Sequence, residues 1–262
     1  PNNMREFLEG GDDLIKKSHE LCANPKALVS LDEVILKAPI LRPPKIIAVG
    51  LNYKDHIEEV QASGREMATP EVPMIFNKQS LSATGPYDEV HDPKVSKMLD
   101  YEGELAMVIS KKCRHVPKEN ATNVIAGYCV ANDLSVRDWQ LRVPTFTIGK
   151  SFDTHCPFGP AIVTSDEISD PHNLSIITSV NGEVRQDWST SDMIYGFAES
   201  AAYLSHYIEL APGDILCSGT GPGTAIESGV NGDRWLKPGD QLEAEVEGAG
   251  ILKNVVGDWQ NS

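Results

Sequence analysis

The stretch DYEGELAMVI, residues 100–109, predicts a buried β-strand that carries two carboxylates on the same face. Because side chains alternate across a strand, Glu102 and Glu104 lie on the face that Ala106 and Val108 continue. This apolar continuation indicates that the two glutamates point into the protein, where like charges raise each other's pKa. A divalent cation is the simplest partner that would stabilise such a pair.

The stretch LEAEVE, residues 242–247, shows that glutamates at alternate strand positions do not by themselves make a site. Its glutamates lie on one face and its apolar side chains on the other, which is typical of a strand with one solvent-facing side. Spacing alone leaves both interpretations of residues 100–109 open. The metal interpretation therefore depends on a third carboxylate farther along the chain.

A third carboxylate follows the apolar run at residues 123–131, which predicts another buried strand. The sequence SVRD that begins at Ser135 resembles a capping box and predicts the start of a helix. On that helix Asp133, Arg137 and Gln140 fall at i, i+4 and i+7, on one face. An acid, a base and an amide that converge at a strand's end favour a binding site, and the alternative is a simple Asp133–Arg137 ion pair at the helix start.

A histidine and a glutamate follow the first predicted strand of the main domain. The run at residues 46–50 predicts a buried strand that breaks at its glycine, and the helical pattern at 52–59 puts His56 and Glu59 on one face. Residues 61–70 have no periodicity and predict a loop, and a His–Glu pair beside a flexible loop is typical of a closing lid. The alternative is a solvated helix with an incidental pair.

The rest of the pattern is β-rich, with a small unit at the N-terminus. A helix is expected over residues 12–22, and Pro43-Pro44 forms a linker, so we divide the chain into a small domain at 1–42 and a main domain at 43–262. Asn181-Gly182 predicts a tight hairpin turn, and a long helix is expected over 191–210. The glycine-rich residues 218–223 predict an anion site for a small carboxylate, because the phosphate-loop pattern is not completed.

Composition limits the classes of partner. The chain of 262 residues carries a formal net charge of −15, which argues against nucleic acid and against an anionic membrane surface as partners. No apolar run has the length of a membrane span, and the five cysteines contain no C-x-x-C pair. These features predict a soluble, cytoplasmic protein with reduced thiols.

Six motifs in a fixed order resemble the fumarylacetoacetate hydrolase family, over roughly residues 43–257. The motifs are KIIAVGLNY with the following His56, DYEGEL at 100–105, NDLSVRDWQ at 132–140, GKSFD at 149–153, VNGE at 180–183 and LCSGT at 216–220. The resemblance is strongest to the branch with acylpyruvate hydrolases, oxaloacetate decarboxylases and tautomerases, and diketo-sugar-acid hydrolases. It implies an α+β, mostly β fold, a mixed β-sandwich roll with a small N-terminal domain, in a homodimer.

The same resemblance assigns roles to particular residues. It implies one Mg²⁺, with Mn²⁺ or Ca²⁺ as possible substitutes, held by Glu102, Glu104 and Asp133. It also implies that His56 and Glu59 form a dyad on a lid. Lys150 is expected to be catalytic, and the expected substrate contacts are Arg137, Gln140, Thr220, Gly219 and Tyr53. Family members commonly have proline where this chain has Gly221, which leaves the pocket for the substrate's tail open.

The function that these roles imply is hydrolysis of a C–C bond in a 2,4-dioxo acid, of the acylpyruvate or diketo-deoxy sugar acid type. His56 would activate a water, Lys150 would stabilise negative charge, and pyruvate would leave as a metal-bound enolate. The alternatives are an oxaloacetate decarboxylase or keto–enol tautomerase, and an isomerase or hydratase of unsaturated 2-hydroxy acids. A metal-binding dimer without activity is the remaining alternative, from a different class of protein.

Overall fold

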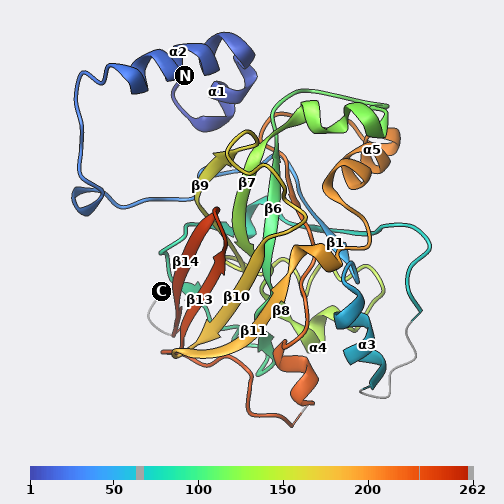
Figure 1. Cartoon of the computed structure of the whole chain (residues 1–262). Coiled ribbons are helices and arrows are strands. Elements are labelled where there is room, and N and C mark those ends of the chain that lie inside the picture. The colour runs from blue at the N-terminus through green and yellow to red at the C-terminus, as the bar shows by residue number, and fades with distance from the viewer. Residues whose placement is uncertain (63–67, 230, 259–262) are drawn as a thin grey trace.

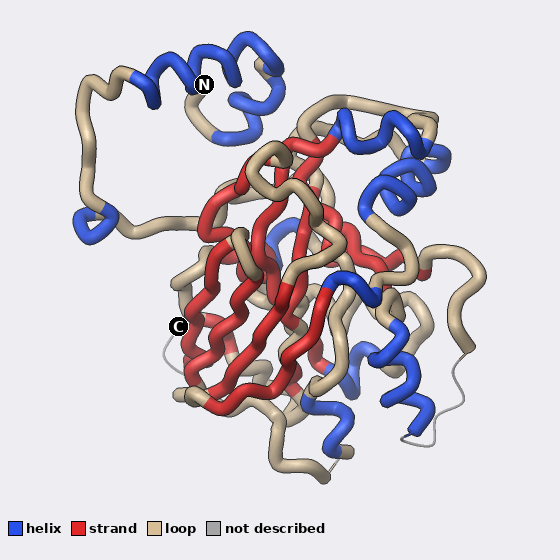
Figure 2. Tube along the Cα trace, viewed as in Figure 1, coloured by secondary structure: helices blue, strands red, loops and turns tan. Residues whose placement is uncertain are grey.

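The computed structural model describes residues 1–62, 68–229 and 231–258, and most of its regular structure is in strands (Figures 1 and 2). A seven-stranded mixed sheet, in the order β2-β1-β12-β6-β7-β9-β3, is the larger of its sheets. Its strands are β1 (Ile46–Gly50), β2 (Met74–Lys78), β3 (Ala83–Thr84), β6 (Gly103–Ile109), β7 (Ile125–Asn132), β9 (Cys156–Thr164) and β12 (Ile215–Cys217). The expected α+β, mostly β architecture is confirmed.

A five-stranded sheet, in the order β11-β10-β13-β14-β4, packs against one face of the larger sheet. Its strands are β4 (Val90–His91), β10 (Ser175–Val180), β11 (Glu183–Ser189), β13 (Gln241–Val246) and β14 (Gly250–Gly257). The predicted hairpin turn joins β10 to β11, with φ of 53° at Asn181 and 78° at Gly182. A third, small sheet pairs β5 (Leu99–Asp100) with β8 (Ser135–Val136).

The strand that decides the fold, β6, lies between β12 and β7 and is buried over its whole length. Leu105 and Met107 face the core between the two sheets, whereas Ala106 and Val108 face a second core on the opposite side. The predicted alternation is confirmed. The strand is interrupted, however, because Tyr101 and Glu102 separate β5 from β6.

The helices surround the sheets: α1 (Met4–Glu9), α2 (Gly11–Ala23), α3 (Lys54–Ala62), α4 (Arg137–Gln140) and α5 (Phe197–Tyr207). Short 3₁₀ turns cover η1 (Leu31–Glu33), η2 (Ser80–Ser82), η3 (Lys118–Val124), η4 (Thr190–Asp192) and η5 (Ala225–Ser228). The described residues contain no helix with both the length and the apolar character of a membrane span.

Two helix predictions were wrong in extent. The capping-box sequence does not start a helix, because Ser135 and Val136 pair with β5 and the Ser135 hydroxyl donates to the carbonyl of Asp133. Helix α4 therefore begins only at Arg137 and has no side-chain cap. The helix expected over 191–210 is also shorter, since α5 begins after an extended Gly196 and ends before the partly exposed Ile208.

Candidate active site

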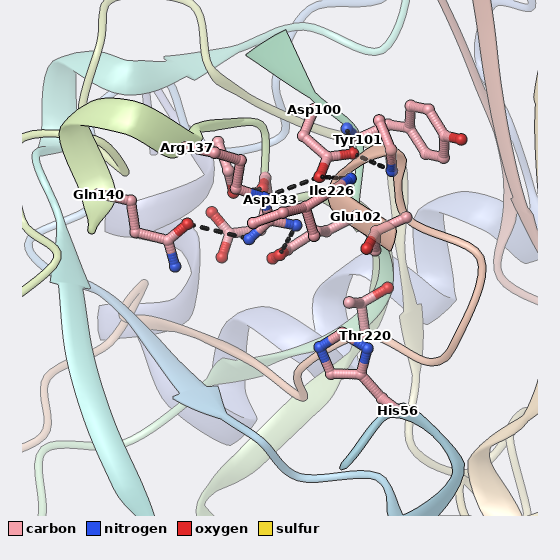
Figure 3. A network of polar contacts seen from close by, with 12 residues as sticks. His56, Asp100, Tyr101, Glu102, Asp133, Arg137, Gln140, Thr220 and Ile226 are labelled. Carbon is pink, nitrogen blue, oxygen red and sulfur yellow. Dashed lines mark hydrogen bonds and ion pairs between the residues drawn. The ribbon is translucent and has the colours of Figure 1, made fainter. Parts of the chain in front are cut away.

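Pairing between β6 and β7 brings the candidate metal ligands together. Gly103 pairs with Asn132, so the residues that flank this pair, Glu102 and Asp133, become neighbours. The Asp133 amide donates to the carbonyl of Glu102 at 2.9 Å. Glu104 follows on the same strand, and Figure 3 shows the polar network that surrounds Glu102 and Asp133.

Three buried carboxylates form the predicted cluster. Glu102, Glu104 and Asp133 each offer an oxygen, and these oxygens lie within 4.8 Å of one another. Glu104 accepts a hydrogen bond from the Gly219 amide at 2.8 Å through Oε2. Its other oxygen, Oε1, is buried and has no hydrogen-bond partner among the described residues. A buried acceptor without a partner is costly, which suits an atom that binds a cation.

The two glutamates of this cluster differ in ionisation. Burial opposes the charge of Glu102, but Arg137 and Lys150 lower its pKa to about 2. Burial raises the pKa of Glu104 well above its usual value, and the charges of Asp133 and Glu102 add to this rise. Without a further cation, the protein therefore favours the protonated form of Glu104 over its carboxylate.

Three cations surround the carboxylates. The Lys150 ammonium lies 2.5 Å from Glu102 Oε2 and 2.7 Å from Asp133 Oδ2. Lys78 contacts Asp133 Oδ1 at 2.5 Å, and Arg137 Nη2 lies 2.6 Å from Glu102 Oε1. With these three positive charges the site suits an anionic ligand, provided that a further cation compensates Glu104.

A divalent cation fits the donor set of the cluster. Carboxylate oxygens are the ligands that Mg²⁺, Mn²⁺ and Ca²⁺ prefer, and Mg²⁺ commonly takes a few carboxylates and completes its shell with water or substrate. The unpartnered Oε1 of Glu104 is the observation on this chain that favours such an ion. Glu102, Glu104 and Asp133 would hold it.

Asp100 fixes the position of Arg137. Its Oδ2 accepts from Arg137 Nε at 2.7 Å and from the Ile226 amide at 3.1 Å, while its Oδ1 accepts from the Ala225 amide at 2.6 Å. Arg137 Nη1 also donates to Gln140 Oε1 at 2.9 Å. The predicted pair of Arg137 and Gln140 is thus brought together, by an acid that the sequence analysis did not select.

The candidate base His56 lies beside two glutamates. His56 comes from α3 and is nearly buried, and its Nδ1 lies 3.4 Å from Glu227 Oε1. Glu59 and Glu227 both accept from the Gly223 amide, at 3.1 and 2.7 Å. Burial lowers the pKa of His56, so the imidazole is neutral at pH 7. Burial and the contact with Glu227 raise the pKa of Glu59 to about 8.

A small cavity of about 130 Å³ connects the two clusters. Of the predicted site residues, it is lined by His56, Glu102, Glu104, Arg137, Gln140, Lys150, Gly219 and Thr220. Apolar side chains complete its wall: Val49, Leu51, Val60, Met74, Phe76, Leu141, Phe146 and Ile226. The cavity joins a polar end to an apolar wall, which is the usual character of a small-molecule site.

Not every predicted residue reaches this cavity. Asp133 and Glu59 do not line it, although Asp133 belongs to the carboxylate cluster and Glu59 is grouped with His56 and Glu227. Tyr53 is buried in the core, where its hydroxyl donates to Ser218 and its ring packs against Trp188. The proposed lid loop lies partly outside the described residues, at 63–67.

Four polar residues of the site were missed. Lys78 shares the buried face of β2 with Phe76, and a lysine on an apolar face was a usable signal. Asp100 opens the quoted stretch itself. Thr224-x-x-Glu227 has capping-box spacing, and the Thr224 hydroxyl does donate to Glu227. Gln186, which hydrogen-bonds to the Gly103 amide and the Thr220 hydroxyl, shares the buried face of β11 with Trp188.

The comparisons with known proteins agree on one family. Residues 45–257 match the model described as fumarylacetoacetate (FAA) hydrolase, C-terminal. The chain is 41% identical over 257 residues to "Oxaloacetate tautomerase Fahd2a, mitochondrial" of Rattus norvegicus, covering 98% of this chain and 80% of that protein. It is 39% identical to "Oxaloacetate tautomerase YisK" of Bacillus subtilis, with 98% and 87% covered.

Solved structures agree with these sequence matches. The crystal structure of a probable 2-hydroxyhepta-2,4-diene-1,7-dioate isomerase from Mycobacterium abscessus superposes with a TM-score of 0.82 at 35% identity. The match covers 97% of this chain and 88% of that one.

Proposed function

Because the chain belongs to the fumarylacetoacetate hydrolase family, we propose that its cavity interconverts the keto and enol forms of a small 2-oxo acid of the oxaloacetate type, with a divalent cation at Glu102, Glu104 and Asp133. The observation that carries the proposal is a neutral His56 that lines the same cavity as Glu102 and Glu104, two of the three clustered carboxylates. A tautomerase needs a base and a cationic site, and no attacking water.

The small size of the cavity supports a short substrate. Its volume of about 130 Å³ is below the 300–1,000 Å³ of pockets for drug-sized ligands. A four-carbon dicarboxylate such as oxaloacetate is more compatible with this volume than a long-tailed dioxo acid. The names of the two curated relatives support the same substrate class.

The side chains of the cavity supply acid–base chemistry. His56 takes the proton from the carbon next to the oxo group and returns it in the reverse direction, since its imidazole is neutral. The Lys150 ammonium stabilises the negative charge that develops on the oxo oxygen, and this oxygen then takes a proton from solvent to complete the enol. Arg137, held by Asp100 and Gln140, binds a carboxylate of the substrate. A bound Mg²⁺ would supply Lewis-acid polarisation of the 2-oxo group.

Hydrolysis of a 2,4-dioxo acid, the primary expectation from the sequence, is the second candidate. The Glu59–Glu227 pair beside His56 favours it, because Glu227 lies 3.4 Å from His56 Nδ1 and could orient the imidazole toward an attacking water. A tautomerase needs no such water. Homodimer formation and a cytoplasmic location stay predictions.

The test is a UV assay on the purified protein with Mg²⁺, with and without EDTA. The substrates are oxaloacetate and acetylpyruvate, and mass spectrometry identifies the products. The proposal expects loss of enol absorbance from oxaloacetate, abolished by EDTA, without cleavage of acetylpyruvate. Release of pyruvate and acetate from acetylpyruvate would replace it with the hydrolase function.

The substitution His56→Ala tests the assigned base. Turnover should fall by about 100-fold or more if general base catalysis operates. The matched control is His172→Ala, which removes an exposed histidine outside the cavity. Turnover that stays unchanged in the His56 variant would remove this residue from the mechanism.

A further inference from the structure

His56, Glu59 and Glu227 form a second cluster of potential metal ligands, separate from Glu102, Glu104 and Asp133. One nitrogen of His56 and one oxygen of each glutamate lie within 4.8 Å of one another. His56 and Glu59 come from α3, whereas Glu227 comes from η5, far along the chain. The fold therefore assembles these three ligand groups from two different segments.

His56 Nδ1 is the independent sign that the cluster can take a ligand. The histidine is 9% exposed, and its Nδ1 is buried without a hydrogen-bond partner in the described part of the chain. This nitrogen lies 3.4 Å from Glu227 Oε1, so it points into the cluster. Because burial keeps the imidazole neutral at pH 7, Nδ1 can offer a lone pair.

The spacing fits a tetrahedral cation. Bonds of about 2.0–2.1 Å from Zn²⁺ to nitrogen and oxygen place two ligand atoms of a tetrahedron about 3.3 Å apart. The Nδ1–Oε1 distance of 3.4 Å matches that edge. The Gly223 amide donates to both Glu59 Oε2 and Glu227 Oε2, so the carboxyl group of Glu59 is held next to that of Glu227.

We propose that His56, Glu59 and Glu227 form a Zn²⁺ site and that Zn²⁺ bound there inhibits the enzyme. One imidazole nitrogen and two carboxylates are a typical ligand set for zinc, which leaves a fourth position for water. Bonds form from Zn²⁺ to the three side chains, and any proton shared by the two carboxyl groups passes to solvent. The ion takes the lone pair with which His56 would act as a base. Inhibition therefore rests on the proposed function, whereas zinc binding does not.

The two clusters differ in the cations that they prefer. Oxygen-only ligands at Glu102, Glu104 and Asp133 suit Mg²⁺, while the imidazole makes the His56 cluster more favourable for zinc. Excess Mg²⁺ should therefore occupy the first cluster and leave the second one available. This difference allows the two sites to be separated in one titration.

The test is isothermal titration of Zn²⁺ into the protein in excess Mg²⁺. We expect one zinc per chain to bind, and Glu227→Gln to weaken this binding by about tenfold or more. Zinc should also raise the melting temperature of the wild type, and it should raise that of Glu227→Gln by less. A cooperative melting transition of Glu227→Gln shows that the variant is folded. Equal binding to both proteins overturns the proposal.

Two control variants identify zinc bound elsewhere. Cys22→Ser removes an exposed thiol on α2, where His19 lies one turn away. Glu104→Gln weakens the oxygen-only cluster. Both variants should keep the zinc affinity of the wild type. If zinc affinity falls in one of them and not in Glu227→Gln, the zinc binds at that control residue and the proposal is contradicted.

An activity measurement then tests inhibition separately from binding. Zinc should inhibit the Mg²⁺-loaded wild type at the concentrations that fill the titrated site. Binding without inhibition would overturn the inhibitory part. If the enzyme turned over no 2-oxo acid, the function proposed above would fail while the calorimetric result on the zinc site would still stand.

Discussion

At the scale of single residues, the site contains acids whose charge is set by their neighbours. Glu102 has two cationic partners and stays ionised, whereas Glu104, two residues along the strand, has an oxygen with no partner among the described residues. Glu59 shares an amide donor with a second carboxylate. The same residue type therefore stands in three different electrostatic environments within this candidate site.

The first prediction concerns Glu104. Glu104→Gln removes the carboxylate that lacks compensation, so Mg²⁺ affinity should fall by about tenfold or more, measured by isothermal titration. Glu243→Gln is the control, since this residue lies on the solvent side of β13. An unchanged affinity in the Glu104 variant would contradict its assignment as a ligand.

The second prediction concerns the pH dependence of stability. The folded protein holds a proton on Glu59, whose pKa is raised to about 8, while the unfolded chain releases it near the ordinary 4.5. Since the folded state then binds more protons between pH 4.5 and 8, this residue's contribution to stability falls as the pH rises through that window.

Urea unfolding of metal-free wild type and Glu59→Gln across this window measures the effect. The difference in unfolding free energy, wild type minus variant, should decrease steadily toward pH 8. A difference that increases with pH would mean that Glu59 is ionised and stabilised by a positive charge.

At the scale of elements, close backbone packing brings α4 to the site. The Val136 amide donates to the Gly149 carbonyl at 2.8 Å, and a Cβ at Gly149 would overlap the backbone of Gln140. Gly149 thus allows the strand β8 and helix α4 to lie against the segment that carries Lys150. This contact sets the distance between Arg137 on α4 and the Lys150 ammonium.

The third prediction follows from this contact. Gly149→Ala should destabilise the fold by about 1–3 kcal/mol and raise KM for the substrate, because it displaces α4. Gly239→Ala is the matched control, since a Cβ there meets no atom within 4 Å but φ is +92°. Both variants should lose stability in thermal unfolding, and only the Gly149 variant should change KM.

At the scale of the whole molecule, two packed sheets enclose one core and the larger sheet carries a second core on its outer face. The N-terminal region joins that outer face through Leu8, Ala38 and Ile40. Figure 1 shows α1 and α2 beside the sheets rather than near α3 and α4, where the site lies. The division into domains at residue 42 remains a prediction.

The fourth prediction links metal binding to global stability. Mg²⁺ at about 100 times its dissociation constant should raise the free energy of unfolding by about 2.7 kcal/mol, and EDTA should abolish the gain. At the same Mg²⁺ concentration, a tenfold weaker Glu104→Gln site would gain about 1.4 kcal/mol. Denaturant unfolding of both proteins measures these gains, and equal gains would place the stabilising ion elsewhere.

The sequence by itself determined where the main strands and the hairpin lie along the chain and which residue types the candidate site contains. Alternation in β6 identified Glu102 and Glu104 on an apolar face, and Asn181-Gly182 identified the hairpin, because strand periodicity and left-handed turn residues are local properties. The family resemblance rested on motifs that also lie within single segments.

Only the tertiary structure decided which partners meet across distant segments. Glu227 reaches His56, and Asp100 holds Arg137, through contacts between parts of the chain that no local pattern connects. Ser135 pairs in a sheet rather than capping a helix because β5 offers it hydrogen bonds. Such outcomes depend on long-range pairing and burial, where tertiary contacts override local propensity.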